Sequence, residues 1–247
     1  MDEPDVLAVF AAALVTALAT GLGAVPFLFV AHPTRSWLGV ANASAAGFMI
    51  AASALLFYEG ARASFPLTAG GVLLGVLLVA WASRRLAGRK GVHFEALGGA
   101  DARRALLLIA VMTVHSFAEG LGVGVSFGGG ESLGLVTAIA IAIHNIPEGL
   151  AISLVLIPQG VGVLRAAGWS ILSSLPQPLV AVPAFLFVAF FDGMVPLGLG
   201  FAGGAMLWMV AAQVVPEARA ATSPRTVTLA LSGSTAAMLG LEALLLA

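Results

Sequence analysis

Long, nearly uninterrupted apolar runs are the feature that most limits what this chain can fold into. Of its 247 residues, 60% are hydrophobic and 9% are charged, whereas soluble domains carry about 25% charged residues. A helix needs about 20 predominantly apolar residues to cross a lipid bilayer. Eight runs meet this requirement, at residues 5–30, 36–59, 66–83, 105–127, 133–157, 166–190, 196–217 and 226–246. The sequence therefore predicts an all-α polytopic membrane protein with eight transmembrane helices.

The connections between these runs predict how the helices are joined. Most of them are short and carry glycine, proline or polar residues. Short connections make consecutive helices antiparallel, so residues 1–247 are expected to form a single transmembrane domain. Residues 47–63 also resemble residues 204–220, and the two segments would run in opposite directions. Such an inverted repeat around a central helix pair is typical of secondary transporters, although alanine-rich membrane helices also resemble one another by chance.

The basic residues predict the orientation of the chain. With eight spans, ten of the 11 Lys and Arg residues fall on one side of the membrane, and Arg62 falls on the other. An excess of Lys and Arg marks the cytoplasmic side, so the connection 84–104 should be cytoplasmic and both termini outside. Segment 1–5 is acidic, whereas a signal peptide begins with a basic region, so the first apolar run is expected to be a retained helix. We expect a multi-pass protein of the cell membrane, and the composition, rich in Ala and Arg, favours a bacterial inner membrane.

Composition also excludes several kinds of site. The chain has no cysteine, which excludes disulfides and thiolate zinc sites. Its formal net charge is −1, and it has no stripe of Lys and Arg that could follow a nucleic acid. Any metal must therefore be bound by nitrogen and oxygen ligands.

Two related motifs carry the functional signal. Each places a histidine four residues before a glutamate, as His115 and Glu119 in one run and His144 and Glu148 in the next. Residues four apart share one face of a helix. Ionisable residues inside a membrane are costly and usually functional. The rise of ~1.5 Å per residue in antiparallel helices puts His115 level with Glu148, and His144 level with Glu119. The motifs therefore predict a His₂Glu₂ metal site near the middle of the membrane.

Nearby residues extend this hypothesis. Pro147 lies inside the second motif, where proline removes a helical hydrogen bond and frees a carbonyl group. Gly120 and Gly149 follow the two glutamates and either leave the backbone uncrowded or let a neighbouring helix approach. Gln177 lies at the same depth, between two prolines of the sixth run. It could bind a metal through its amide oxygen, hydrogen-bond a ligand, or simply mark a structural kink.

The motif His144-Asn145-Ile146-Pro147-Glu148-Gly149, after a related unit on the preceding run, resembles the ZIP (Zrt/Irt-like) metal transporters, and within them the bacterial and GufA-like branches. The resemblance implies eight spans, outward termini and uptake of zinc or related divalent cations. It also implies that His115, Glu119, His144 and Glu148 are metal ligands with Asn145 beside them.

This chain departs from the family pattern at two positions that bear on the metal site. Ser116 stands where such proteins commonly have Asn, and Gln177 where they often have Glu. Relatives in the family can hold two adjacent metals bridged by carboxylates. Both departures remove oxygen ligands or negative charge, so we expect one well-formed metal site and a second that is weak or absent. Asn145, Ser116 and Gln177 still count as candidate metal-binding residues beside the two His-Glu pairs.

The sequence is therefore interpreted as a transporter, not an enzyme, that moves Zn²⁺ into the cytoplasm by alternating access to the site at mid-membrane. Cd²⁺, Fe²⁺ and Mn²⁺ remain alternative substrates, because ligand type alone does not rank them. Channel-like or proton-coupled cation permeation is the main rival. An intramembrane metallohydrolase is a weaker one, since it would need an activated water and an open coordination position. The partners expected are the metal ion and the lipid bilayer, and the sequence leaves open whether the chain forms a homodimer.

Overall fold

A computed structural model describes residues 5–30, 34–87 and 99–246, and every regular element within these ranges is a helix. The helices are α1 (Val6–Gly21), η1 (Leu22–Leu28), α2 (Arg35–Ala87), α3 (Gly99–Gly128), α4 (Glu131–Leu156), η2 (Ile157–Gln159), α5 (Val163–Ser174), α6 (Pro176–Phe190), η3 (Asp192–Met194), α7 (Val195–Met209), the π-helix η4 (Val210–Val214), α8 (Val215–Ala221) and α9 (Pro224–Leu246).

Seven helical segments in the described residues are long and apolar enough to cross a membrane. This confirms the predicted class of all-helical polytopic membrane protein. The difference from the eight predicted runs lies in α2, where 36–59 and 66–83 belong to one helical element of 53 residues.

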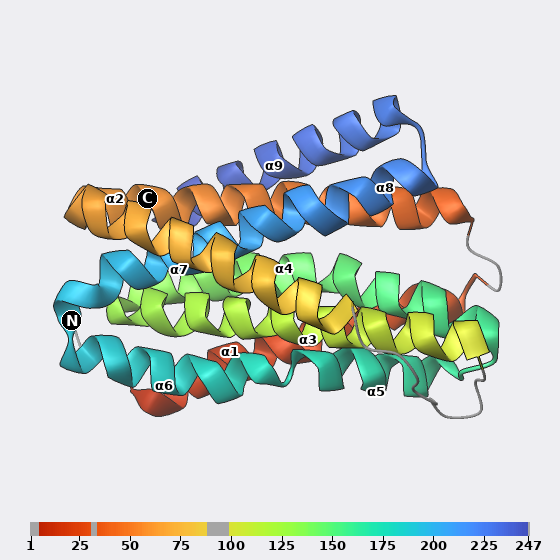
Figure 1. The fold of residues 1–247 in the computed structure, drawn as a ribbon, viewed down its shortest axis with the longest axis horizontal. Helices are drawn as coiled ribbons and strands as arrows, with labels where there is room; N and C mark the ends of the chain where they lie inside the picture. Colours follow the sequence, from red (N-terminus) through yellow and green to blue (C-terminus); the bar gives the residue numbers. More distant parts are fainter. Residues whose placement is uncertain (1–4, 31–33, 88–98, 247) are drawn as a thin grey trace.

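The element α2 is two helical segments joined at a kink. Ser64 has non-helical backbone angles, with φ −160° and ψ 102°, and Pro66 follows two residues later. A proline lacks the N–H that would continue the helical ladder, and sharp kinks usually occur at this residue. Figure 1 shows the second segment of α2 turning back from the first across the molecule.

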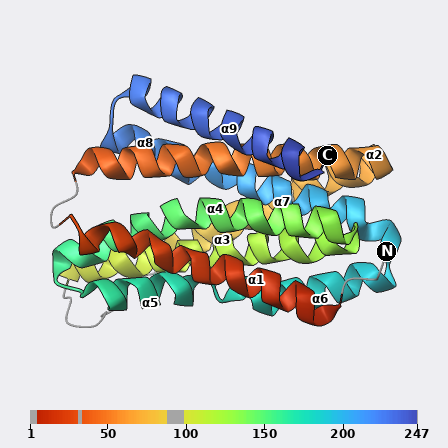
Figure 2. The ribbon, with the colours of Figure 1, turned by 180° about the vertical axis from the view of Figure 1, so that it is seen from behind.

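The helices form two groups that meet along α3 and α4. Figures 1 and 2 show α2, α7, α8 and α9 on one side, and α1, α5 and α6 on the other. The helix α9 packs mainly on α2, whereas α4 packs against α1, α2 and α3, and α3 packs against α6 and α7. The two helices that carry the predicted metal ligands therefore lie in the middle of the molecule.

Glycines next to the two glutamates allow these helices to pack closely. A Cβ atom added to Gly149 would lie 1.7 Å from the carbonyl oxygen of Thr20 on α1, and one added to Gly120 would lie 2.6 Å from the carbonyl oxygen of Gln177 on α6. Both glycines therefore serve close helix packing, which brings α1 and α6 against the two helices of the site.

Candidate metal site

Four ionisable side chains meet between α3 and α4. His115 and Glu119 lie one turn apart on α3, and His144 and Glu148 lie one turn apart on α4. All four are buried, and one ligand atom from each lies within 4.8 Å of the others. A group of two imidazoles and two carboxylates so close together can enclose a small cation, because every member offers a lone pair.

The contacts inside this cluster follow the pairing that helix depth predicts. His115 Nε2 lies 2.5 Å from Glu148 Oε1, and His144 Nε2 lies 2.7 Å from Glu119 Oε1. A third contact of 2.9 Å joins His115 Nε2 to Glu119 Oε1. Glu119 Oε1 therefore faces both imidazoles. The helix α4 continues through Pro147, so both of its motif residues stay on one face.

The three other predicted site residues have different surroundings. The Nδ2 atom of Asn145 donates to the Thr16 carbonyl oxygen at 2.8 Å and to Gln177 Oε1 at 3.2 Å. The Nε2 atom of Gln177 donates to Glu119 Oε2 at 2.5 Å. Ser116 is buried on α3, directly after His115 in the chain. The structure thus places Asn145 and Gln177 beside the cluster, where both use their amide nitrogens.

Two residues at the site were missed from the sequence. The hydroxyl group of Thr16 on α1 lies 2.5 Å from Gln177 Oε1. The Sδ atom of Met209 lies 2.8 Å from His115 Nδ1, at the end of α7 and directly before the π-helix η4. The sequence signal for Thr16 is its spacing of four from Thr20, which puts two hydroxyl groups on one face of an apolar helix. For Met209 the weak signal is its position three residues after Met206.

Four buried polar atoms at the site make no hydrogen bond within the described part of the chain. They are His144 Nδ1, Asn145 Oδ1, His115 Nε2 and Glu148 Oε1, and the last two face each other at 2.5 Å. A buried acceptor without a partner costs about 1–3 kcal/mol. A polar occupant of the cluster would offset this cost at the atoms that it contacts.

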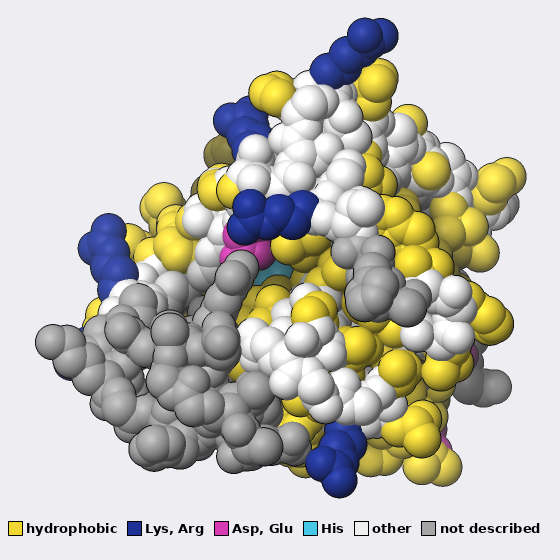
Figure 3. Space-filling model, turned by 90° about the vertical axis from the view of Figure 1, so that its right-hand side faces the viewer, with side chains coloured by type: hydrophobic (Ala, Val, Ile, Leu, Met, Phe, Trp, Pro, Cys, Tyr) yellow, Lys and Arg dark blue, Asp and Glu magenta, His cyan; other side chains and the backbone are white. Residues whose placement is uncertain are grey.

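The site is visible from the end of the molecule where α2, α3, α5 and α9 begin. Figure 3 shows Lys and Arg side chains at this end and, among them, a small part of a histidine that adjoins an acidic side chain in this view. The described residues contain only two of the chain's histidines, His115 and His144, so the visible one belongs to the cluster. His32 and His93 lie outside the described residues.

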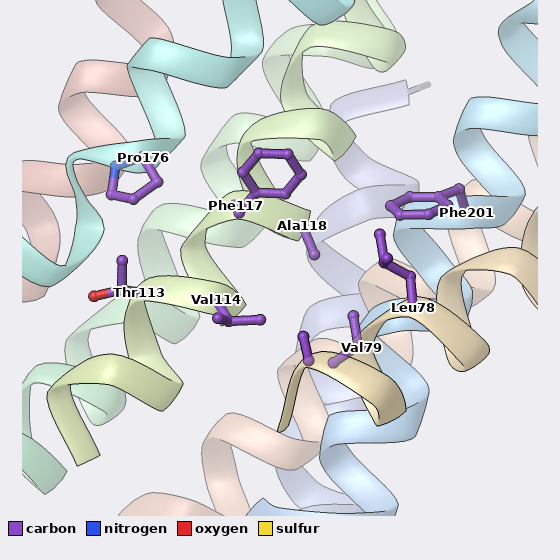
Figure 4. A pocket seen from close by; sticks show the side chains of 9 residues that line it. Leu78, Val79, Thr113, Val114, Phe117, Ala118, Pro176 and Phe201 are labelled. Atoms are coloured by element: carbon purple, nitrogen blue, oxygen red, sulfur yellow. The ribbon is translucent and has the colours of Figure 1, made fainter. Parts of the chain in front are cut away.

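A separate cavity of about 300 Å³ lies between α3 and residues of α2, α6 and α7. Figure 4 shows Phe117, Ala118, Phe201 and Leu78 around this space. Its lining is almost entirely apolar, and none of the four clustered ionisable side chains lines it. This cavity offers nothing to a cation, so the cluster remains the candidate metal site.

Comparison with known proteins agrees with this chemistry. A family model described as ZIP Zinc transporter matches residues 90–246. A candidate zinc transporter of Arabidopsis thaliana is 48% identical over 235 residues, which cover 94% of this chain and 38% of that protein. The zinc transporter GufA of Myxococcus xanthus is 33% identical over 233 residues, covering 89% of this chain and 92% of that protein. The zinc transporter ZIP11 of Homo sapiens is 36% identical over 129 residues, covering 49% of this chain and 38% of that protein. The chain thus spans less than half of the Arabidopsis relative and nearly all of the Myxococcus one.

Proposed function

We propose that this chain, which belongs to the ZIP zinc transporter family, carries divalent metal cations across a cell membrane, with Zn²⁺ as its main substrate. The observation that supports this most is the buried His₂Glu₂ cluster, whose ligand atoms lie within 4.8 Å of one another. It lies between two helices of membrane-spanning length. The proposed ligands are His115, Glu119, His144 and Glu148.

The chemistry of the cluster suits zinc. Neutral imidazole and carboxylate are common zinc ligands, and four ligands match its preferred tetrahedral geometry. Two carboxylates also balance the charge of one divalent cation, which offsets the cost of keeping charged groups inside a membrane. The same ligands accept Cd²⁺, Fe²⁺ and Mn²⁺, so competition among these ions belongs to the proposal.

The topology that we propose has eight crossings, two of them supplied by the segments of α2 on either side of Ser64. Support comes from the length of α2, because 53 helical residues at ~1.5 Å each would extend far beyond a hydrocarbon core of ~30 Å if the helix were straight. The basic end of the molecule in Figure 3 then faces the cytoplasm. Both termini are outside, and transport runs toward the cytoplasm.

The mechanism that we propose is alternating access, in which one helix group moves against the other and exposes the metal to each side in turn. The two groups visible in Figure 1 meet at the helices of the site, so a relative movement would change access to the cluster. A channel would instead hold a continuous path open.

Zinc uptake by the purified protein in liposomes separates these two possibilities. A carrier has to rearrange once for every ion, so we expect the initial uptake rate to saturate as external Zn²⁺ is raised. We also expect external Cd²⁺ to compete with Zn²⁺ for uptake. The rate is measured with a zinc-sensitive dye inside the liposomes, and protein-free liposomes serve as the control. A rate that rises linearly with zinc over the whole accessible range would indicate a channel, and uptake no faster than in the control would contradict the proposed function.

A further inference from the structure

A chain of hydrogen bonds that starts at the backbone of α1 fixes how Gln177 faces the cluster. The Thr16 carbonyl oxygen accepts from Asn145 Nδ2 at 2.8 Å. A backbone carbonyl group can only accept, so the Asn145 atom at this position must be the amide nitrogen. The same nitrogen lies 3.2 Å from a side-chain atom of Gln177. That atom must therefore be the acceptor, Oε1.

It follows that the other amide atom, Gln177 Nε2, points at Glu119. It lies 2.5 Å from Glu119 Oε2, and both residues are fully buried. Turning the amide around would put two acceptor oxygens together at Glu119 and two N–H groups together at Asn145. Because both clashes would be buried, each would cost free energy. The Gln177 oxygen consequently faces Thr16 and Asn145, and it is not available to a metal in the cluster.

The two carboxylate oxygens of Glu119 thus contact different groups. Oε1 faces His115 and His144, while Oε2 is held by the Gln177 amide. A carboxylate that bridges two cations with one oxygen on each needs both oxygens free of other partners. A second divalent cation would also add two positive charges to a cluster whose two carboxylates balance only the first, and unbalanced buried charge is strongly unfavourable.

We infer that Gln177 is a positioning residue that donates its amide N–H to Glu119, so that the site holds a single divalent cation. This inference rests on the proposed function. In it, Gln177 Nε2 occupies the position next to Glu119 Oε2 that a second cation would otherwise occupy. Thr16 and Asn145 hold the amide in this orientation.

The test is the number of zinc ions bound per chain in the wild type and in Gln177→Glu. The substitution replaces the donor nitrogen with a carboxylate oxygen next to Glu119 Oε2, where two anionic oxygens repel each other unless a cation or a shared proton lies between them. Equilibrium dialysis of the purified protein against ZnCl₂ at about pH 8, where carboxylates are ionised, followed by elemental analysis, is expected to give one zinc in the wild type and two in Gln177→Glu.

The matched control is Gln159→Glu, which adds the same charge in η2, beyond the end of α4 and away from the cluster. It should bind one zinc, like the wild type. Two zinc ions in the wild type, or one in a folded Gln177→Glu, would overturn the inference. If Gln177→Glu does not fold, the wild-type count alone decides between one and two. A wild type that binds no zinc would instead contradict the proposed function itself.

Discussion

Replacing His144 or Glu148 by alanine is expected to abolish zinc uptake into liposomes. Each substitution removes one of the four proposed ligands and one contact within the cluster, to Glu119 in the first case and to His115 in the second. Loss of a residue that hydrogen-bonds a metal ligand typically lowers metal affinity by about 10–100-fold. Loss of a ligand itself should lower the affinity further. Uptake should therefore fall to the rate of protein-free liposomes, measured at equal amounts of inserted protein.

The control for this pair is Glu131→Ala. Glu131 is the first residue of α4 and is exposed, so its removal changes the charge of the same helix without touching the cluster. It should leave uptake within about twofold of the wild type, since exposed substitutions usually have small effects. Undiminished uptake by both His144→Ala and Glu148→Ala would remove these residues from the metal site.

Replacing Gly149 by alanine is expected to destabilise the folded protein strongly. The added Cβ would lie 1.7 Å from the Thr20 carbonyl oxygen, which belongs to the backbone of α1 and cannot turn away as a side chain could. Overpacking a core typically costs about 1–3 kcal/mol and occasionally more. We expect the upper end of this range, because whole helices must separate. The measurement is the melting temperature in detergent, together with the monodisperse fraction on size exclusion.

The same substitution at Gly168 provides the control. Gly168 lies within α5, and an added Cβ there would meet nothing within 4 Å. Alanine is favoured over glycine inside a helix by roughly 0.5–1 kcal/mol, so Gly168→Ala should melt at the wild-type temperature or slightly above. Equal melting temperatures for Gly149→Ala and Gly168→Ala would show that α1 and α4 are not packed as closely as the structure indicates.

Sequence patterns predict this fold and the centre of its site because both depend on local spacing. The apolar runs give the class of protein, and the spacing of four puts His and Glu on one helix face. The rise per residue of an α-helix and the opposite directions of the two helices then give the depth of each residue, which places His115 opposite Glu148. The number of crossings stays a prediction, because residues 36–59 and 66–83 belong to the single element α2, whose two helical segments meet at a kink at Ser64.

The remaining contacts depend on how each helix is rotated about its axis, and a uniformly apolar helix carries little information about this. Thr16 and Gln177 are 161 residues apart, and His115 and Met209 are 94 apart. No spacing rule connects residues so distant in sequence. The orientation of the Gln177 amide follows only from the Thr16 carbonyl, through Asn145, so it could not be predicted before the helices were in place.

The central claim is that His115, Glu119, His144 and Glu148 bind the transported metal, and the most direct test is to locate zinc in crystals of the protein. Diffraction data recorded above and below the zinc absorption edge should show one anomalous peak between α3 and α4. Ligand distances of about 2.0–2.2 Å to these side chains are expected. A zinc peak outside this cluster, with none within reach of His144 and Glu148, would contradict the claim.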